Sequence, residues 1–150
     1  MIIITLGTFD IGHYGHLKLL KKCKGISERF QYNPMRPNAV IVGLNTDDFI
    51  KRYKNKPPIM SYKERETFLY ETGFVDGIIP NDQTDGTAKK AILISNAKMI
   101  VIGSDWGRKP YLKQLGIDWD WLDSKGIALT YVTYTKGVST TEIKKRCNKQ

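Results

Sequence analysis

Five short apolar runs alternate with longer stretches whose apolar residues recur at helical spacing, and this order constrains the fold most. The runs are rich in β-branched residues, as buried strands are, and they span residues 2–6, 39–45, 75–80, 98–103 and 127–134. Strands that alternate with helices favour a parallel sheet with helices on both faces. The sequence therefore predicts an α/β, Rossmann-like, doubly wound fold with a parallel five-stranded sheet, and residues 1–150 form a single domain.

Local signals place several of the predicted helices and loops. Ser61 and Ser139 are each followed three residues later by a glutamate, which is the capping-box pattern of a helix start. Asp85 is placed to cap a further helix over residues 86–95. Residues 51–60, which contain two adjacent prolines, are predicted as a basic loop.

The charge balance indicates an anionic ligand. The chain has 24 Lys and Arg against 15 Asp and Glu, a formal net charge of +9, which attracts nucleotides, nucleic acid or acidic membrane surfaces alike. No dense basic run alternates with aromatic residues, so we expect small phosphorylated ligands and no nucleic acid.

Membrane insertion and disulfide formation are not expected. No apolar run approaches the ~20 residues that a membrane span needs, and the N-terminus lacks a basic leader. Cys23 and Cys147 are the only cysteines and do not form a CxxC motif. We therefore expect a cytoplasmic chain with free thiols and no membrane partner.

The most polar loops follow three of the predicted strands. They read GTFDIGHYGH over residues 7–16, GSDWGRK over 103–109 and TKGVSTTE over 135–142. In an open parallel sheet, ligands bind outside the carboxyl ends of the strands. The fold therefore predicts that these loops meet at one edge.

The first of these loops is suited to binding developing negative charge. His13 and His16 stand one helical turn apart, and an imidazole donates a hydrogen bond in either protonation state. Gly7 and Gly15 let a ligand approach the backbone closely. Two other interpretations remain open from the residues alone: a metal site, for which Asp10 is the nearby third ligand, and two histidines with a structural role only.

The third loop begins the last predicted helix. Ser139 and Thr140 add two hydroxyls to the free N–H groups of a helix N-terminus, which is a general anion site. A plain helix cap explains the same residues, and the two roles are compatible.

These motifs resemble a known family. GTFDIGHYGH is similar to the GTFD-x-x-H-x-G-H signature of the cytidylyltransferase-like nucleotidyltransferases, and GVSTTEIKKR is similar to their G-I-S-T-T-x-I-K element. The elements NTDDF, SYKER, FVDGIIP and IGSDW also occur in the family's order. Within the family, the chain is most similar to the glycerol-3-phosphate cytidylyltransferases. The resemblance covers nearly the whole chain.

The resemblance implies a reaction and its partners. An alcohol phosphate, glycerol 3-phosphate or similar, would attack the α-phosphorus of CTP, and pyrophosphate would leave. Mg²⁺ would be the cofactor, bound with the triphosphate and without a dedicated metal site on the protein. The family also implies a homodimer. ATP in place of CTP, and a non-catalytic nucleotide-binding module, are the alternatives.

Matching the family motifs residue by residue gives each position an expected role. The catalytic residues would be His13, His16 and Lys54. The nucleotide-binding residues would be Gly7, Thr8, Phe9, Asp10, Gly15, Asp105, Trp106, Ser139 and Thr140. The residues that bind the phosphorylated substrates would be Lys56, Arg65 and Lys136.

Two departures from the family pattern concern positive charge. Tyr134 and Gly73 stand where close relatives carry arginines. Lys136 lies two residues after Tyr134 and can supply a compensating charge toward the triphosphate. These departures leave the identity of the acceptor open.

Overall fold

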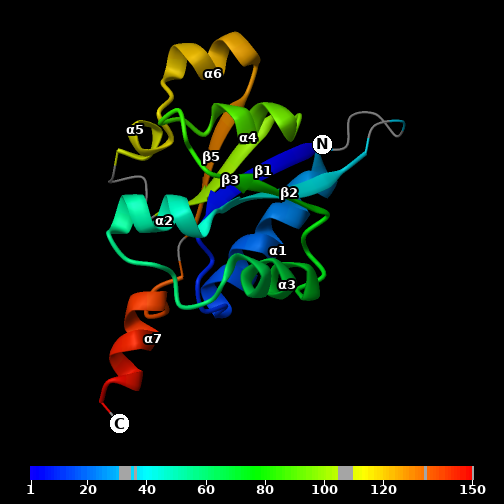
Figure 1. The fold of residues 1–150 in the computed structure, drawn as a ribbon. Coiled ribbons are helices and arrows are strands. Elements are labelled where there is room, and N and C mark those ends of the chain that lie inside the picture. The colour runs from blue at the N-terminus through cyan, green and yellow to red at the C-terminus, as the bar shows by residue number, and fades with distance from the viewer. Residues whose placement is uncertain (31–34, 36, 105–109, 134, 150) are drawn as a thin grey trace.

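A five-stranded parallel sheet forms the centre of the molecule in the computed structural model, which describes residues 1–30, 35, 37–104, 110–133 and 135–149 (Figure 1). The strands are β1 (Ile2–Gly7), β2 (Ala39–Asn45), β3 (Gly77–Asn81), β4 (Met99–Gly103) and β5 (Ala128–Val132). Their order in the sheet is β3-β2-β1-β4-β5, and every neighbouring pair is parallel. The predicted fold class is confirmed, with the chain order reversing between β1 and β4.

Helices cover both faces of the sheet (Figure 1). They are α1 (Tyr14–Arg29), α2 (Asp47–Lys54), α3 (Tyr62–Glu71), α4 (Lys89–Ile94), α5 (Tyr111–Leu115), α6 (Trp119–Lys125) and α7 (Thr140–Cys147). Helices α1 and α3 lie against one face, and α4, α5 and α6 lie against the other. Helix α7 (red) extends away from these layers.

Adjacent residues of β1 point into different cores because side chains alternate across a strand. Ile3 packs with Cys23 of α1, whereas Ile4 packs with Ile92 of α4 and Leu122 of α6. All five of these side chains are fully buried. The apolar run that opens the sequence thus joins both helical layers.

The predicted basic loop over residues 51–60 is wrong at its start, because helix α2 continues to Lys54. Thr46 caps this helix by accepting from the backbone N–H of Phe49. Phe49 and Ile50 are buried, so packing holds the first turn in place. Asn55 then ends the helix in the left-handed conformation, with φ of 55°.

The expected cap at Asp85 is also wrong. Its carboxylate accepts from the N–H and hydroxyl of Thr87, which closes a local turn. Helix α4 begins later, after Ala88, with no side-chain cap. The two serine caps are confirmed: Ser61 and Glu64 form a reciprocal capping box, and Ser139 accepts from the N–H of Glu142.

Both cysteines are free, as expected, with Cys23 buried and Cys147 exposed. Within the part of the chain that the structure describes, no helix is both long and apolar enough to cross a bilayer.

Candidate active site

The two predicted histidines meet at the N-terminus of α1. His13 is the N-cap residue, and its Nδ1 accepts from the backbone N–H of Gly15 at 3.1 Å. Its ring stacks on that of His16, with centroids 3.7 Å apart and planes 22° apart. Since Nδ1 of His13 accepts a hydrogen bond, the proton of the neutral ring is on Nε2, which is left to donate.

Burial keeps both imidazoles neutral at physiological pH. Desolvation lowers the pKa of His16 to about 3, and the neighbouring His13 lowers it further than Asp10 raises it. Desolvation also lowers the pKa of His13. Among the described residues, Nδ1 of His16 is buried and has no hydrogen-bond partner. The pair therefore offers neutral N–H donors at a helix N-terminus, where a negative charge is favoured.

Glycines make room for the ring stack. A Cβ on Gly15 would lie 2.9 Å from Cε1 of His13, and one on Gly7 would lie 3.0 Å from the ring of Phe9. A Cβ on Gly12, which the sequence analysis did not single out, would lie 2.3 Å from the ring of Phe68. The nearest neighbours of these glycines are thus aromatic rings: His13 and Phe9 in the same loop, and Phe68 on α3.

The loop before α1 has a strained backbone. Phe9 and Ile11 adopt the left-handed region, with φ of 52° and 51°, which side chains rarely adopt. The buried ring of Phe9 lies 5.0 Å from that of His16, centroid to centroid. Such strain persists where surrounding contacts enforce it, and it is common at functional sites.

Asp10 supplies several of those contacts. Its carboxylate accepts from the backbone N–H groups of Ile59 at 3.0 Å and Met60 at 2.9 Å. Its backbone carbonyl accepts from the hydroxyl of Thr140 at 2.6 Å, and Lys144 Nζ lies 3.5 Å from its Oδ2. Asp10 therefore ties the first loop to the segment after α2 and to helix α7.

The charge around Asp10 is predominantly positive. Burial alone would raise the pKa of Asp10, but the N–H groups of Ile59 and Met60, with Lys144, hold it below its ordinary value. Desolvation, followed by the like charge of Lys144, lowers the pKa of Lys54, and Lys56 adds to the effect. The positive charges of Lys56 and Lys144 thus both act on Lys54.

Lys144 is a site residue that the sequence analysis missed. It stands four residues after Thr140 on α7, so both side chains lie on the same face of the helix. The shared helix face of Thr140 and Lys144 could be predicted from the sequence once the helix was placed at Ser139. The pairing of Lys144 with Asp10 could not be predicted from the sequence, because only the fold brings the two ends of the chain together.

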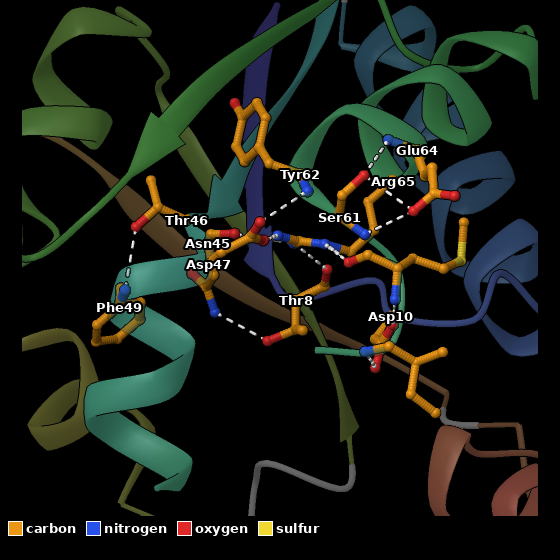
Figure 2. Close-up of polar contacts among 12 residues, drawn as sticks. Thr8, Asp10, Asn45, Thr46, Asp47, Phe49, Ser61, Tyr62, Glu64 and Arg65 are labelled. Atoms are coloured by element: carbon orange, nitrogen blue, oxygen red, sulfur yellow. Dashed lines mark hydrogen bonds and ion pairs between the residues drawn. The ribbon is translucent and has the colours of Figure 1, made fainter. Parts of the chain in front are cut away.

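Arg65 has a different role from the one predicted (Figure 2). Its side chain is fully buried, and its guanidinium donates to the carbonyls of Thr8, Asn45 and Met60 and to the carboxylate of Asp47. A phosphate cannot reach a guanidinium enclosed in this way. The expected substrate contact is therefore corrected: Arg65 positions the loop at Thr8.

The remaining predicted residues lie at the same edge or outside the described residues. Ser139 and Thr140 begin α7, and the carbonyl of Val138 lies 3.6 Å from where a Cβ on Gly15 would stand. Lys136 is exposed. Asp105, Trp106 and Tyr134 lie outside the described residues. The expected ligand contacts of Asp105 and Trp106 stay predictions, as do those of Lys56 and Lys136.

The metal interpretation of the histidine pair has no support in the described part of the chain. No group of three or more His, Cys, Asp or Glu side chains there is arranged to hold a metal ion.

Comparisons with known proteins identify the family. Residues 4–146 match the model of the cytidylyltransferase-like family. The chain is 32% identical over 143 residues to the glycerol-3-phosphate cytidylyltransferase of Bacillus subtilis (strain 168), covering 95% of this chain and 93% of the relative. It is 30% identical to the enzyme of that name from Staphylococcus aureus, covering 95% and 91%. The chain belongs to the cytidylyltransferase-like family.

A solved structure supports the fold. The lipopolysaccharide core biosynthesis protein from Thermoplasma volcanium superimposes with a TM-score of 0.64 at 22% identity, covering 92% of this chain and 98% of that one. The family model and the named relatives confirm the predicted membership of a nucleotidyltransferase family.

Proposed function

We propose that this protein transfers CMP from CTP to glycerol 3-phosphate, or to a similarly small alcohol phosphate, and releases pyrophosphate. The observation that carries the proposal is the stacked, neutral His13–His16 pair at the start of α1, in the loop whose Asp10 pairs with Lys144. The names of the relatives support glycerol 3-phosphate as the acceptor. The implied homodimer and the cytoplasmic location are part of the proposal.

The histidines act on the α-phosphate in this mechanism. An oxygen of the acceptor phosphate forms a bond to the α-phosphorus of CTP while the bond from that phosphorus to the pyrophosphate oxygen breaks. Negative charge grows on the oxygens around phosphorus, and N–H donors fixed in advance stabilise it. Neutral imidazoles donate without giving up a proton, so no covalent or protonated enzyme intermediate is needed.

The nucleotide enters as its Mg²⁺ complex. The backbone N–H groups at the start of α7, with Ser139 and Thr140, are suited to the β- and γ-phosphates. Lys144 adds a positive charge near this helix start and Lys136 is exposed in the loop before it, which fits an anionic ligand. Magnesium supplies further charge neutralisation when it is bound with the triphosphate. Asp105 and Trp106 are proposed to contact the base and ribose.

In this proposal, Lys54 and Lys56 bind the acceptor phosphate. Lys54 ends α2, which follows β2, and Lys56 lies two residues further on. We propose that Lys54 neutralises the α-phosphate and the incoming phosphate together. Holding both reactants in line supplies much of the rate enhancement in such a transfer.

Pyrophosphate release tests the proposal. We expect the fastest release with CTP among CTP, ATP, UTP and GTP, and only when a phosphorylated alcohol such as glycerol 3-phosphate is present. Preference for ATP would identify an adenylyltransferase with the same chemistry. No release with any nucleotide across a panel of phosphorylated alcohols would favour a non-catalytic binding module and contradict the proposal.

A further inference from the structure

The two active-site histidines differ in how their Nδ1 atoms are held. Nδ1 of His13 accepts from the backbone N–H of Gly15, which is free to donate because it belongs to the first turn of α1. His16 lies further into the helix, where backbone N–H groups bond to carbonyls one turn back. Its Nδ1 is buried and has no partner among the described residues. A hydrogen bond to this nitrogen must therefore come from a side chain.

The hydroxyl of Thr5 is a buried donor on the same side of the sheet. Thr5 is fully buried, and its Oγ1 also has no partner within the described chain. Its neighbours in β1, Ile4 and Leu6, point into the core under α4 and α6, so Thr5 points toward α1. Val42, which pairs with Thr5 across the strands, lies in one core with Leu20 of α1. A donor and an acceptor that both lack partners thus share one buried layer.

The packing along β1 places Thr5 opposite the part of α1 that begins at His16. The side chain two positions before Thr5 packs with Cys23 of α1. Gly7, two positions after Thr5, faces the ring of Phe9, whose centroid lies 5.0 Å from that of the His16 ring. Thr5 lies between these two levels, and the stretch of α1 between them runs from His16 to Cys23.

The hydrogen bond at Nδ1 determines what the rest of the His16 ring can do. A neutral imidazole has one N–H and one acceptor nitrogen, so donation from Nε2 to a phosphate oxygen requires Nδ1 to be the acceptor. A donor placed at Nδ1 favours that form of the ring. We infer that the Thr5 hydroxyl, directly or through one water, supplies the hydrogen bond at Nδ1 and keeps Nε2 of His16 protonated for the α-phosphate. This inference rests on the proposed function and makes Thr5 a positioning residue.

Removing the hydroxyl tests this inference. Thr5→Val keeps the shape of the side chain, and we expect kcat for pyrophosphate release to fall about tenfold while Kd for CTP stays within about twofold. Thr5→Ser keeps the hydroxyl and should retain a near-wild-type kcat. Ser27→Ala, which removes a buried hydroxyl bonded to the carbonyl of Met1, should leave both quantities unchanged. In the His16→Ala background, Thr5→Val should have no further effect, because it acts through that ring.

A wild-type kcat in Thr5→Val would overturn the inference, as would effects of Thr5→Val and His16→Ala that multiply in the double variant.

The ring nitrogens of His16 give a readout that needs no turnover. NMR of isotope-labelled protein shows which ring nitrogen carries the proton. We expect Nε2 to carry it in the wild type, and we expect the Nδ1 signal to move in Thr5→Val and not in Thr5→Ser. A proton on Nδ1 in the wild type, or an Nδ1 signal unchanged in Thr5→Val, would contradict the inference. Absence of turnover with every nucleotide would instead count against the proposed function, and the ring signals would still decide the role of Thr5.

Discussion

Lys144 Nζ in helix α7 lies 3.5 Å from Oδ2 of Asp10 in the first loop, so a charge pair joins the two ends of the chain at the site. The Asp10 side chain is 7% exposed and that of Lys144 is 32% exposed. One member of the pair is thus fixed by the fold, while the other retains contact with solvent. This arrangement places α7, which has no fully buried residue, against the active-site loop.

Removing Lys144 should weaken nucleotide binding more than stability. In Lys144→Met, we expect Kd for CTP with Mg²⁺ to rise about tenfold, because a positive charge and the tie to Asp10 are both lost. The free energy of unfolding should fall by no more than about 1 kcal/mol, since the pair is partly exposed. Calorimetry and urea unfolding measure the two quantities. Lys145→Met, an exposed neighbour on the same helix, is the matched control. Equal Kd values for the two variants would contradict this prediction.

Replacing Arg65 should, in contrast, mainly lower the stability of the fold. Arg65→Leu leaves buried carbonyls of the active-site loop without donors and Asp47 without its cation, so we expect a loss of about 3–5 kcal/mol in the free energy of unfolding. Lys63→Ala, which removes an exposed ion pair on the same helix, should lower the free energy of unfolding far less. Chemical denaturation compares them, and a similar small loss in both variants would show that Arg65 does not brace the loop.

Much of this architecture was predictable because it follows from local pattern. The β-branched runs gave the strands, and Ser61 and Ser139 marked two helix starts. The last turn of α2 was not predictable from its basic residues, because the helix is started by the Thr46 cap and the buried Phe49 and Ile50 and continues until Asn55 ends it. The structural role of Arg65 was missed for a similar reason. An arginine within a motif is expected to be exposed and to bind a ligand, and only the fold shows that its side chain is enclosed.

The histidine pair gives the protein a pH-dependent stability. The pKa of His16 is about 3 in the folded protein and about 6.5 when unfolded, so protonation favours the unfolded chain. The stabilisation is fully present above pH 6.5 and is lost as pH falls through the window from 6.5 toward 3. Between pH 7 and 5, His16 should account for a loss of about 2 kcal/mol.

Urea unfolding at pH 7 and pH 5 measures that loss. His16→Gln keeps a polar side chain of similar size without a titrating ring, so the loss between these pH values should shrink by about 2 kcal/mol. Cys147→Ser, an exposed change at the end of α7, should keep the wild-type difference. An unchanged pH dependence in His16→Gln would show that His16 titrates normally.

The kcat of histidine variants tests the central claim most directly. We predict that His13→Ala and His16→Ala each lower kcat for pyrophosphate release from CTP and glycerol 3-phosphate by ~10²–10³, the usual effect of losing one fixed donor to a developing charge. Kd for CTP should change by less than about fivefold, because the contacts strengthen mainly in the transition state. Near-normal kcat in both folded variants would contradict the mechanism, as would a loss confined to nucleotide binding.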